Sequence, residues 1–184
     1  ILAFAAIKNN DKIGLIVFSD KIEHTIPPKK GKAHIWNIIR TILNFKPEGK
    51  GTNLSLPLKY LLNIQKRKAT AFLISDFQDI DYEAALKLAK QKHDLVAISI
   101  TDPREETLPD VGLIQLEDAE TGETLLVDTH DKDMTANYAK KFQQKREQQK
   151  TYFSFIGIDT IEIHTNRSLT DPIIRYFKMR EKKH

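Results

Sequence analysis

The sequence contains no cysteine among its 184 residues. Disulfide bridges and thiolate metal sites are therefore excluded, and a secreted, cross-linked scaffold is disfavoured. No apolar run is long enough to span a bilayer, because lysine and aspartate interrupt each candidate. The hydrophobic fraction of 40% suffices for a two-sided α/β core. These features predict a cytoplasmic protein.

Motifs of several well-known chemistries are also missing. No HExxH occurs, and the six histidines are too widely spaced for a metal pair, so we expect them at the surface or at helix caps. The GKGTN stretch at residues 49–53 resembles a phosphate-binding loop, but a helical pattern precedes it where that loop needs a strand. No nucleophile elbow of a serine hydrolase is present. The sequence therefore gives little support to an enzyme.

The formal net charge of +4 is unevenly distributed. Residues 140–150 and residues 175–184 each carry five basic residues and one acid. Such segments could bind nucleic acid, but no zinc finger or aromatic-rich RNA motif accompanies them. Lysine and glutamine interleaved at helical spacing favour a solvated helix face, and nucleic-acid binding remains an alternative.

The chain begins at Ile1, without methionine and inside an amphipathic pattern. We therefore expect a piece of a longer protein whose upstream part is missing. No linker, repeat or low-complexity segment interrupts residues 1–184, which predicts a single domain.

Apolar runs of strand length alternate with helical patterns along the chain. This alternation predicts a doubly wound, mainly parallel α/β sheet with right-handed crossovers. Residues 22–28 predict an antiparallel edge strand that ends at two prolines, and residues 112–129 predict a β-hairpin insertion with its turn at residues 118–122. The other expected strands are residues 13–19, 71–75, 95–102 and 159–165. A helix is expected to end within residues 1–9, and further helices are expected at residues 33–45, 54–65, 81–94, 133–156 and 170–182.

The strands at residues 13–19 and 71–75 are continuously apolar, so we expect helices to cover both of their faces. The helix at residues 81–94 has Asp81 as a candidate N-cap. Helical spacing predicts that two sets of side chains face the core: Ile35, Ile38, Ile39, Ile42 and Leu43 in one helix, and Ala85, Leu88 and Ala89 in another.

In doubly wound sheets, ligands bind beyond the carboxyl ends of the strands. Among the loop residues selected by this rule, Thr52 and Asp76 offer a hydroxyl and a carboxylate, which suit Mg²⁺ or Mn²⁺. The alternative is structural, with each residue capping the helix that follows it. Asp79 is expected in the first turn of a helix, facing water. The other selected residues are Ser19, Asp20, Asn53, Ser75, Thr101 and Asp102.

Four stretches of the sequence are characteristic: DKIGLIVFSDKIEHTIPPKKG, PEGKGTNL, AFLISDFQD and, most distinctively, DPREETLPDVGLIQLEDAETGE. Together they resemble the von Willebrand factor A-like proteins of the domain of unknown function 58 family. The resemblance implies a metal-ion-dependent adhesion site built from three loops, with Thr52 as the second-loop ligand and Asp76 as the third-loop ligand. The first loop, Asp-x-Ser-x-Ser, has no match here.

By the same resemblance, the strand that carries the first loop is missing between the strands at Ile13 and Phe72. We therefore expect unpaired backbone groups there, unless the two strands close up on each other or another chain fills the gap. We also expect Mg²⁺ or Mn²⁺ to bind this chain weakly or not at all, although the complete protein would hold it.

The resemblance implies a protein-binding or adaptor module, with a MoxR-type AAA+ ATPase as a partner in the assembly or maturation of other proteins. It does not imply an enzyme. The alternative is a metal-dependent phosphohydrolase that uses Asp76 and Asp102, although the convergent carboxylates of a two-metal site are not evident in the sequence.

Overall fold

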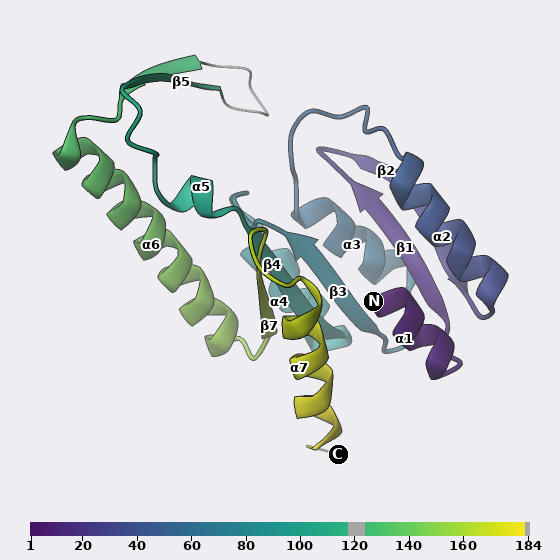
Figure 1. Ribbon diagram of the computed structural model, residues 1–184. Coiled ribbons are helices and arrows are strands. Elements are labelled where there is room, and N and C mark those ends of the chain that lie inside the picture. The colour runs from purple at the N-terminus through teal and green to yellow at the C-terminus, as the bar shows by residue number, and fades with distance from the viewer. Residues whose placement is uncertain (118–123, 183–184) are drawn as a thin grey trace. The chain divides into compact units, whose positions relative to one another are not determined.

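A computed structural model describes residues 1–117 and 124–182, and the chain divides into two compact units (Figure 1). The first unit comprises Ile1–Ile64 and Asp79–Leu86. The second comprises Gln65–Gln78 and the chain from Lys87 onwards. Each unit has its own strands.

The first unit is built on an antiparallel pair, β1 (Ile13–Phe18) and β2 (Ile22–Lys29). The predicted edge strand is thereby confirmed. The helices α1 (Leu2–Lys8), α2 (Lys32–Asn44) and α3 (Ser55–Ile64) lie at the predicted positions. Asn10 lies between α1 and β1 and has a φ of 54°, a left-handed conformation that asparagine tolerates. This conformation turns the chain from the helix towards the strand.

Burial in the first unit is lower than the apolar pattern predicted. Every residue of β1 is half-buried or exposed, so the expectation of a strand covered on both faces is wrong here. In α2, Ile35 and Ile38 are buried as predicted, but Ile42 and Leu43 are 53% and 78% exposed. The apolar stripe of α2 therefore contributes to the core only over its first two turns.

The second unit contains a parallel sheet of β3 (Thr70–Ser75), β4 (Asp94–Thr101) and β7 (Asp159–His164), in the order β3-β4-β7. Strands β5 (Leu113–Glu117) and β6 (Thr124–Asp128) form the predicted hairpin, whose turn at residues 118–122 lies outside the described residues. Helices α5 (Pro103–Glu106), α6 (Lys132–Phe155) and α7 (Thr170–Glu181) complete the unit. No helix of the described chain is both long enough and apolar enough to cross a bilayer.

The α/β class is confirmed, but the expected single sheet is divided. The described strands form one three-stranded parallel sheet and two antiparallel pairs. Among these residues β1 is hydrogen-bonded to β2 alone, and β3 to β4 alone. Among the described residues, each of these two strands thus keeps one edge without a strand partner.

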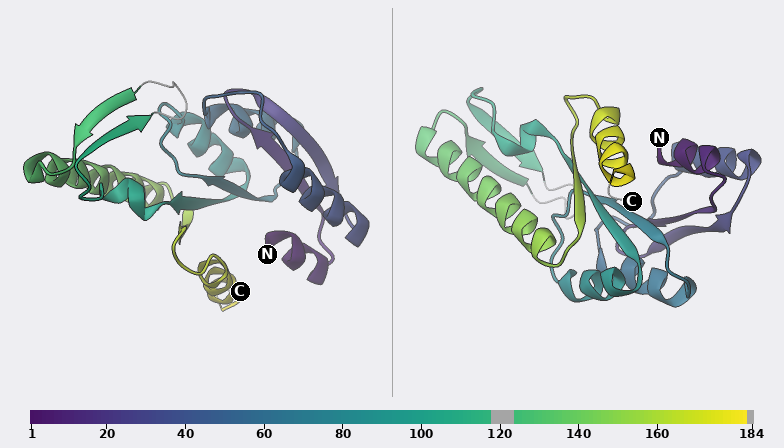
Figure 2. Two further views of the ribbon diagram at one scale, coloured as in Figure 1. Left: turned by 45° about the horizontal axis from the view of Figure 1, so that its top comes forward. Right: turned by 90° about the horizontal axis from the view of Figure 1, so that it is seen from below.

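The core of the second unit surrounds β4, where Leu95, Val96, Ala97 and Ile98 are nearly inaccessible to solvent. Helices α6 and α7 flank the neighbouring strand β7 (Figures 1 and 2). Phe153 of α6 packs edge-on against Phe77, with ring centroids 5.1 Å apart. In β3 only Leu73 is buried and Ile74 is 47% exposed, so the prediction of a fully covered strand is wrong for this strand as well.

Polar contacts at the C-terminal end of α7 fasten it to two strands. Arg180 pairs with Asp94 at 2.6 Å, and the Tyr176 hydroxyl donates to Asp159 at 3.0 Å. Burial raises the pKa of Tyr176 to about 12, so this hydroxyl keeps its proton at physiological pH. Both acceptors stand at the first residue of a strand, and α7 is thereby held at the amino-terminal edge of the sheet.

Helix α4 (Glu83–Lys92) begins two residues later than its predicted cap. Asp81 has a φ of 59° and precedes the helix, so the N-cap assignment is wrong. The inward stripe is Ala85, Leu86 and Ala89, whereas Leu88 is 54% exposed. The later start sets which residues share the buried face.

His93 directly follows α4, at the helix end, and is only 1% exposed. Of the surface and helix-cap positions expected for the histidines, the surface position is therefore wrong for this residue. Neither ring nitrogen has a hydrogen-bond partner among the described residues. Burial lowers the pKa of His93 from its ordinary value of 6.5, because the charged imidazolium would lose its hydration. The fold therefore holds His93 neutral.

This depressed pKa makes stability depend on pH. The unfolded chain binds a proton at His93 more readily than the folded chain does. The folded state therefore has its full stability with respect to His93 above about pH 6.5, and it loses stability as the pH falls from there through the pKa of the folded chain. We expect His93→Leu to raise the free energy of unfolding by about 1–3 kcal/mol, since it removes unpaired buried polar atoms. Urea unfolding between pH 5 and pH 8 should show a shallower pH dependence for this variant.

The matched control is His24→Leu, because His24 is exposed on β2. It should keep the pH dependence of the native chain. Parallel pH profiles for the native chain and His93→Leu would show that His93 does not titrate on unfolding.

Candidate functional site

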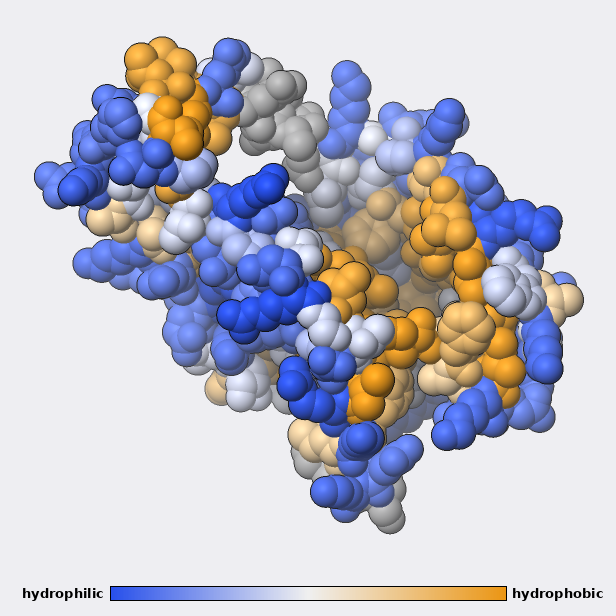
Figure 3. Space-filling model, viewed as in Figure 1, coloured by the Kyte–Doolittle hydropathy of each residue, from blue (hydrophilic) through white to orange (hydrophobic). Residues whose placement is uncertain are grey.

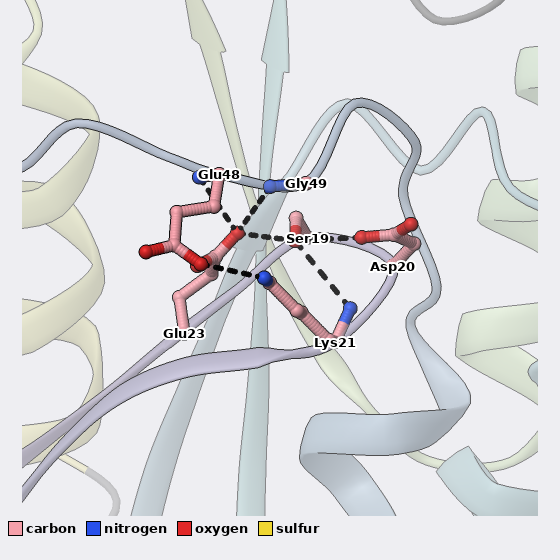
Figure 4. A network of polar contacts seen from close by, with 6 residues as sticks. All are labelled: Ser19, Asp20, Lys21, Glu23, Glu48 and Gly49. Atoms are coloured by element: carbon pink, nitrogen blue, oxygen red, sulfur yellow. Dashed lines mark hydrogen bonds and ion pairs between the residues drawn. The ribbon is translucent and has the colours of Figure 1, made fainter.

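The turn after β1 carries two of the predicted polar residues, Ser19 and Asp20. Ser19 is buried, and its hydroxyl donates toward Glu23 Oε1 at 2.7 Å and toward Asp20 Oδ1 at 3.0 Å. Glu23 projects from β2, which returns beside β1 directly after the turn. The hairpin geometry thus places a carboxylate beneath the turn (Figure 4).

The same carboxylate oxygen also holds the loop at residues 45–54. Glu23 Oε1 accepts the Gly49 N–H at 2.7 Å and the Glu48 N–H at 3.1 Å. These bonds, with the Gly49 N–H as the largest contributor, lower the pKa of Glu23. Lys21 adds an ion pair with Glu48 at 2.8 Å, and the loop is therefore fixed to the hairpin at several points.

Gly49 lies so close to the turn that any side chain would collide with it. A Cβ at this position would overlap Ser19 Oγ and Asp20 Oδ1. A Cβ at Gly51 would meet only the Asp20 Cβ, at an ordinary 3.7 Å. The first glycine is thus required for the close approach of the loop, and the second is not.

Thr52 and Asn53 follow in this loop, immediately before α3. The Asn53 N–H donates to the Ser19 carbonyl at 3.0 Å, which joins the loop to the turn again. Asn53 Oδ1 accepts the Leu56 N–H at 3.2 Å and Asp79 Oδ2 accepts the Leu54 N–H at 2.7 Å. Asn53 and Asp79 therefore cap α3, whereas the structural alternative gave that role to Thr52. Asp79 is not a first-turn acid facing water, because α4 starts only at Glu83.

In the second unit, Ser75 and Asp76 stand at the carboxyl end of β3. Ser75 Oγ accepts the Phe77 N–H at 3.0 Å and donates to Asp76 Oδ1 at 3.2 Å. Asp76 Oδ1 also accepts the Gln78 N–H at 3.2 Å. Asp76 thus stabilises the turn after the strand, and its interpretation as the N-cap of the next helix is wrong.

The carboxyl end of β4 adds Asp102, whose Oδ1 accepts the Arg104 N–H at 2.9 Å as the cap of α5. Burial, with repulsion from Asp76 and Asp102, raises the pKa of Glu105. An open hollow of about 470 Å³ lies beside Asp102 and is also lined by Arg104 and Asn166. Thr101 is buried and is not available to a ligand.

The structure therefore groups the predicted residues by unit. Ser19, Asp20 and Asn53 are joined in the first unit, whereas Ser75, Asp76 and Asp102 share the carboxyl edge of the sheet in the second. Thr52 belongs to the first unit and Asp76 to the second, so their pairing at a cation stays a prediction. In the described chain no group of three or more histidine, aspartate or glutamate side chains is placed to hold a metal ion.

Glu23 was missed by the sequence analysis, although it is the central acceptor of the first unit. The pattern of residues 22–26 drew attention to Ile22, His24 and Ile26. The available signal was a carboxylate four residues after the serine that ends a strand, with a glycine-rich loop further along the chain. That signal becomes specific only when the hairpin register is known, because the register decides whether Glu23 lies beneath the turn.

The two glycines provide a matched test of the loop. We expect Gly49→Ala to destabilise the native chain by about 1–3 kcal/mol, because a methyl group has no room beside Ser19 and Asp20. Gly51→Ala should change stability by no more than about 1 kcal/mol, since its contacts are ordinary. Hydrogen exchange at the Asn53 amide should accelerate only in Gly49→Ala, and equal exchange in both variants would contradict a tight loop.

Comparisons with known proteins place the chain among relatives of similar length and among longer ones. It is 29% identical to an uncharacterized protein of Mycobacterium avium over 160 residues, which cover 85% of this chain and 94% of the relative. It is 25% identical to an uncharacterized protein of Mycobacterium tuberculosis over 175 residues, 94% of this chain. That alignment covers 55% of the relative, so this chain spans about half of its length.

Two solved structures have the same fold. The BatB protein of Bacteroides thetaiotaomicron is 13% identical with a TM-score of 0.55, over 98% of this chain and 84% of the other. An aerotolerance-related membrane protein of Bacteroides fragilis is 14% identical with a TM-score of 0.57, over 100% of this chain and 86% of the other.

A family model described as a protein of unknown function, DUF58, matches residues 1–148. Because this match covers most of the chain, the protein belongs to the DUF58 family.

Proposed function

We propose that this chain is a protein-binding module of von Willebrand factor A type, which works with a MoxR-type AAA+ ATPase in the assembly or maturation of other proteins. Membership of the DUF58 family and the fold shared with the two Bacteroides proteins support this proposal. In this proposal, the turn at Ser19 and Asp20 and the loop that carries Thr52 bind a partner protein and do not catalyse a reaction.

The observation that carries the proposal is the rigid presentation of Ser19, Asp20 and the Thr52 loop at the carboxyl end of β1. One carboxylate oxygen of Glu23 accepts hydrogen bonds from Ser19, Glu48 and Gly49 and so fastens the loop to the turn. Asp20 is exposed and Thr52 is half-buried. Preorganised polar groups of this kind lower the ordering cost of binding a partner.

This chain would supply two oxygen ligands to a divalent cation, Thr52 and Asp76. A hydroxyl and one carboxylate compete poorly with the hydration shell of Mg²⁺. We therefore propose that the chain alone binds Mg²⁺ weakly.

Binding to a purified MoxR-type ATPase tests the proposed function directly. We expect Thr52→Ala to weaken the complex by about tenfold, because the loop would lose its central hydroxyl. The control is Thr107→Ala, which changes an exposed threonine of the second unit and should leave the affinity unchanged. Surface plasmon resonance would measure both, and an equal affinity for native chain and Thr52→Ala would contradict a role for this loop.

Calorimetric titration with MgCl₂ tests the cation proposal separately. We expect no saturable heat in the micromolar range for the native chain, and the same result for Thr52→Ala and Asp76→Asn. Asp171→Asn, an exposed acid of α7, serves as the background control. Tight binding by the native chain that either substitution abolishes would show that the present ligands suffice.

A further inference from the structure

Helices α1 and α2 of the first unit present apolar side chains to solvent. Trp36 and Leu43 of α2 are 55% and 78% exposed, and Phe4 of α1 is 53% exposed. The Phe4 and Trp36 rings meet edge-on with their centroids 6.2 Å apart, so the two helices share this surface. Figure 3 shows apolar atoms over both helices, with hydrophilic atoms bordering them. Exposed apolar side chains that adjoin one another indicate a contact with another molecule.

The packing of α2 fixes which of its sides meets solvent. Ile35 is buried, and the His34 ring donates through Nε2 to the Ile13 carbonyl of β1 at 2.9 Å. These contacts turn the flank that carries Trp36 and Leu43 outward, and the two side chains lie on the same side of the helix because they are two turns apart. Helical spacing adds neighbours to this flank, and together with the α1 ring they form the α1–α2 surface: Phe4, Lys32, Trp36, Ile39, Arg40 and Leu43.

The charged residues in and around the α1–α2 surface are basic. Residues 24–47 contain no aspartate or glutamate, and neither does α1. Lys32 and Arg40 are exposed within the surface. In the described chain neither of them is in an ion pair, and the same holds for the exposed lysines at the ends of the two helices: Lys8, Lys29, Lys30 and Lys46. Their positive charge is therefore available to a partner.

The basic stretches of the second unit differ in this respect. Arg146 of α6 pairs with Glu106 at 2.6 Å, and Lys150 pairs with Glu162 at 2.9 Å. Part of their charge is thus neutralised within the chain. The sequence contains one tryptophan, which lies in α2. The α1–α2 surface is accordingly the stronger candidate for an anionic partner.

The combination of side chains on this surface favours a bilayer with anionic headgroups. Lysine and arginine pair with lipid phosphates, aromatic rings favour the headgroup region, and aliphatic side chains enter the outer part of the acyl chains. A second copy meeting this surface symmetrically would bring Lys32 and Arg40 of both chains together, which repulsion disfavours. Nucleic acid would match the basic groups and the rings but would leave Ile39 and Leu43 in water.

We infer that the α1–α2 surface rests on an anionic lipid bilayer, with the axis of α2 along the plane of the membrane. Trp36 and Leu43 are about 10 Å apart along the helix and point to the same side, so both reach the bilayer only when the axis lies flat. The contact is shallow, because side chains enter the headgroup region while Ile35 stays in the protein core. The inference shares no residue with the turn at Ser19 and is independent of the proposed partner there.

The single tryptophan of the chain makes the contact directly measurable. The probe is a vesicle of phosphatidylcholine with roughly one-third phosphatidylglycerol, and the control is a vesicle of phosphatidylcholine alone. With the anionic vesicle we expect the Trp36 emission to shift to shorter wavelength, to be quenched by brominated acyl chains and to return as salt is added. An unchanged emission, or an equal shift with neutral vesicles, would overturn the inference.

Substitution of an exposed leucine tests the apolar part of the contact without a change of charge. Leu43→Gln should weaken vesicle binding by at least about fivefold, because it removes a side chain that enters the bilayer. The matched control is Leu126→Gln, which changes an exposed leucine of the second unit and should bind as the native chain does. Flotation of the vesicles in a density gradient measures both, and equal binding by the two variants would contradict the proposed contact.

A pair of double variants tests the basic part. Lys32→Glu with Arg40→Glu should weaken binding by at least about tenfold, since it reverses both charges within the surface. Lys140→Glu with Lys141→Glu changes the net charge by the same amount on exposed positions of α6 and should keep most of the native affinity. An equal loss in both double variants would show attraction by net charge alone and would overturn the inference.

Titrations with a short DNA duplex and with polyglutamate identify the other possible occupants. Either one should leave the Trp36 emission nearly unchanged, because neither offers an apolar phase to the ring. A shift larger than the one caused by anionic vesicles would assign the surface to nucleic acid or to an acidic protein instead. Circular dichroism should confirm that all variants are folded.

Discussion

The backbone of β4 is hydrogen-bonded along both edges, to β3 on one side and to β7 on the other. Because its backbone N–H and C=O groups have hydrogen-bond partners on both sides, β4 can be buried without leaving these groups unpaired. Its apolar side chains form the centre of the second unit. Strands β1 and β3 each have one hydrogen-bonded edge in the described chain, and their side chains stay partly exposed. Among these three strands, the one with two paired edges is therefore the most deeply buried.

The same requirement for satisfied polar groups shapes the loops. In the first unit, the glycine-rich loop has no regular structure and cannot pair its own N–H groups, so Glu23 accepts two of them. In the second unit, Asp76 and Asp102 accept N–H groups of the turns that follow them. Candidate binding residues and structural acceptors are therefore partly the same side chains. A partner that approaches these carboxylates meets groups whose positions are already fixed.

The periodicity of the sequence was enough to locate most elements. Strand β7, helices α6 and α7 and the β5–β6 hairpin begin and end within a few residues of their predicted bounds, since each has a strong pattern and a clear punctuating residue. Predictions of burial were less successful. Ile42, Leu43 and Leu88 fit an apolar stripe yet lie exposed, because a stripe records which side of a helix is apolar and not how far the neighbouring element extends.

For the candidate site, too, the positions of residues along the chain were predicted better than their contacts. The local pattern correctly placed Ser75, Asp76 and Asp102 at strand ends, because strand and loop are properties of consecutive residues. The caps of α3 could not be found in this way: Asp79 is 25 positions from Leu54, and only the folded chain brings its carboxylate to that N–H. Glu23 likewise became an acceptor for Gly49 through the register of β1 and β2. Chain-local patterns therefore specified the elements and the residues at their ends, whereas contacts between distant segments, which depend on register and packing, decided the role of each side chain.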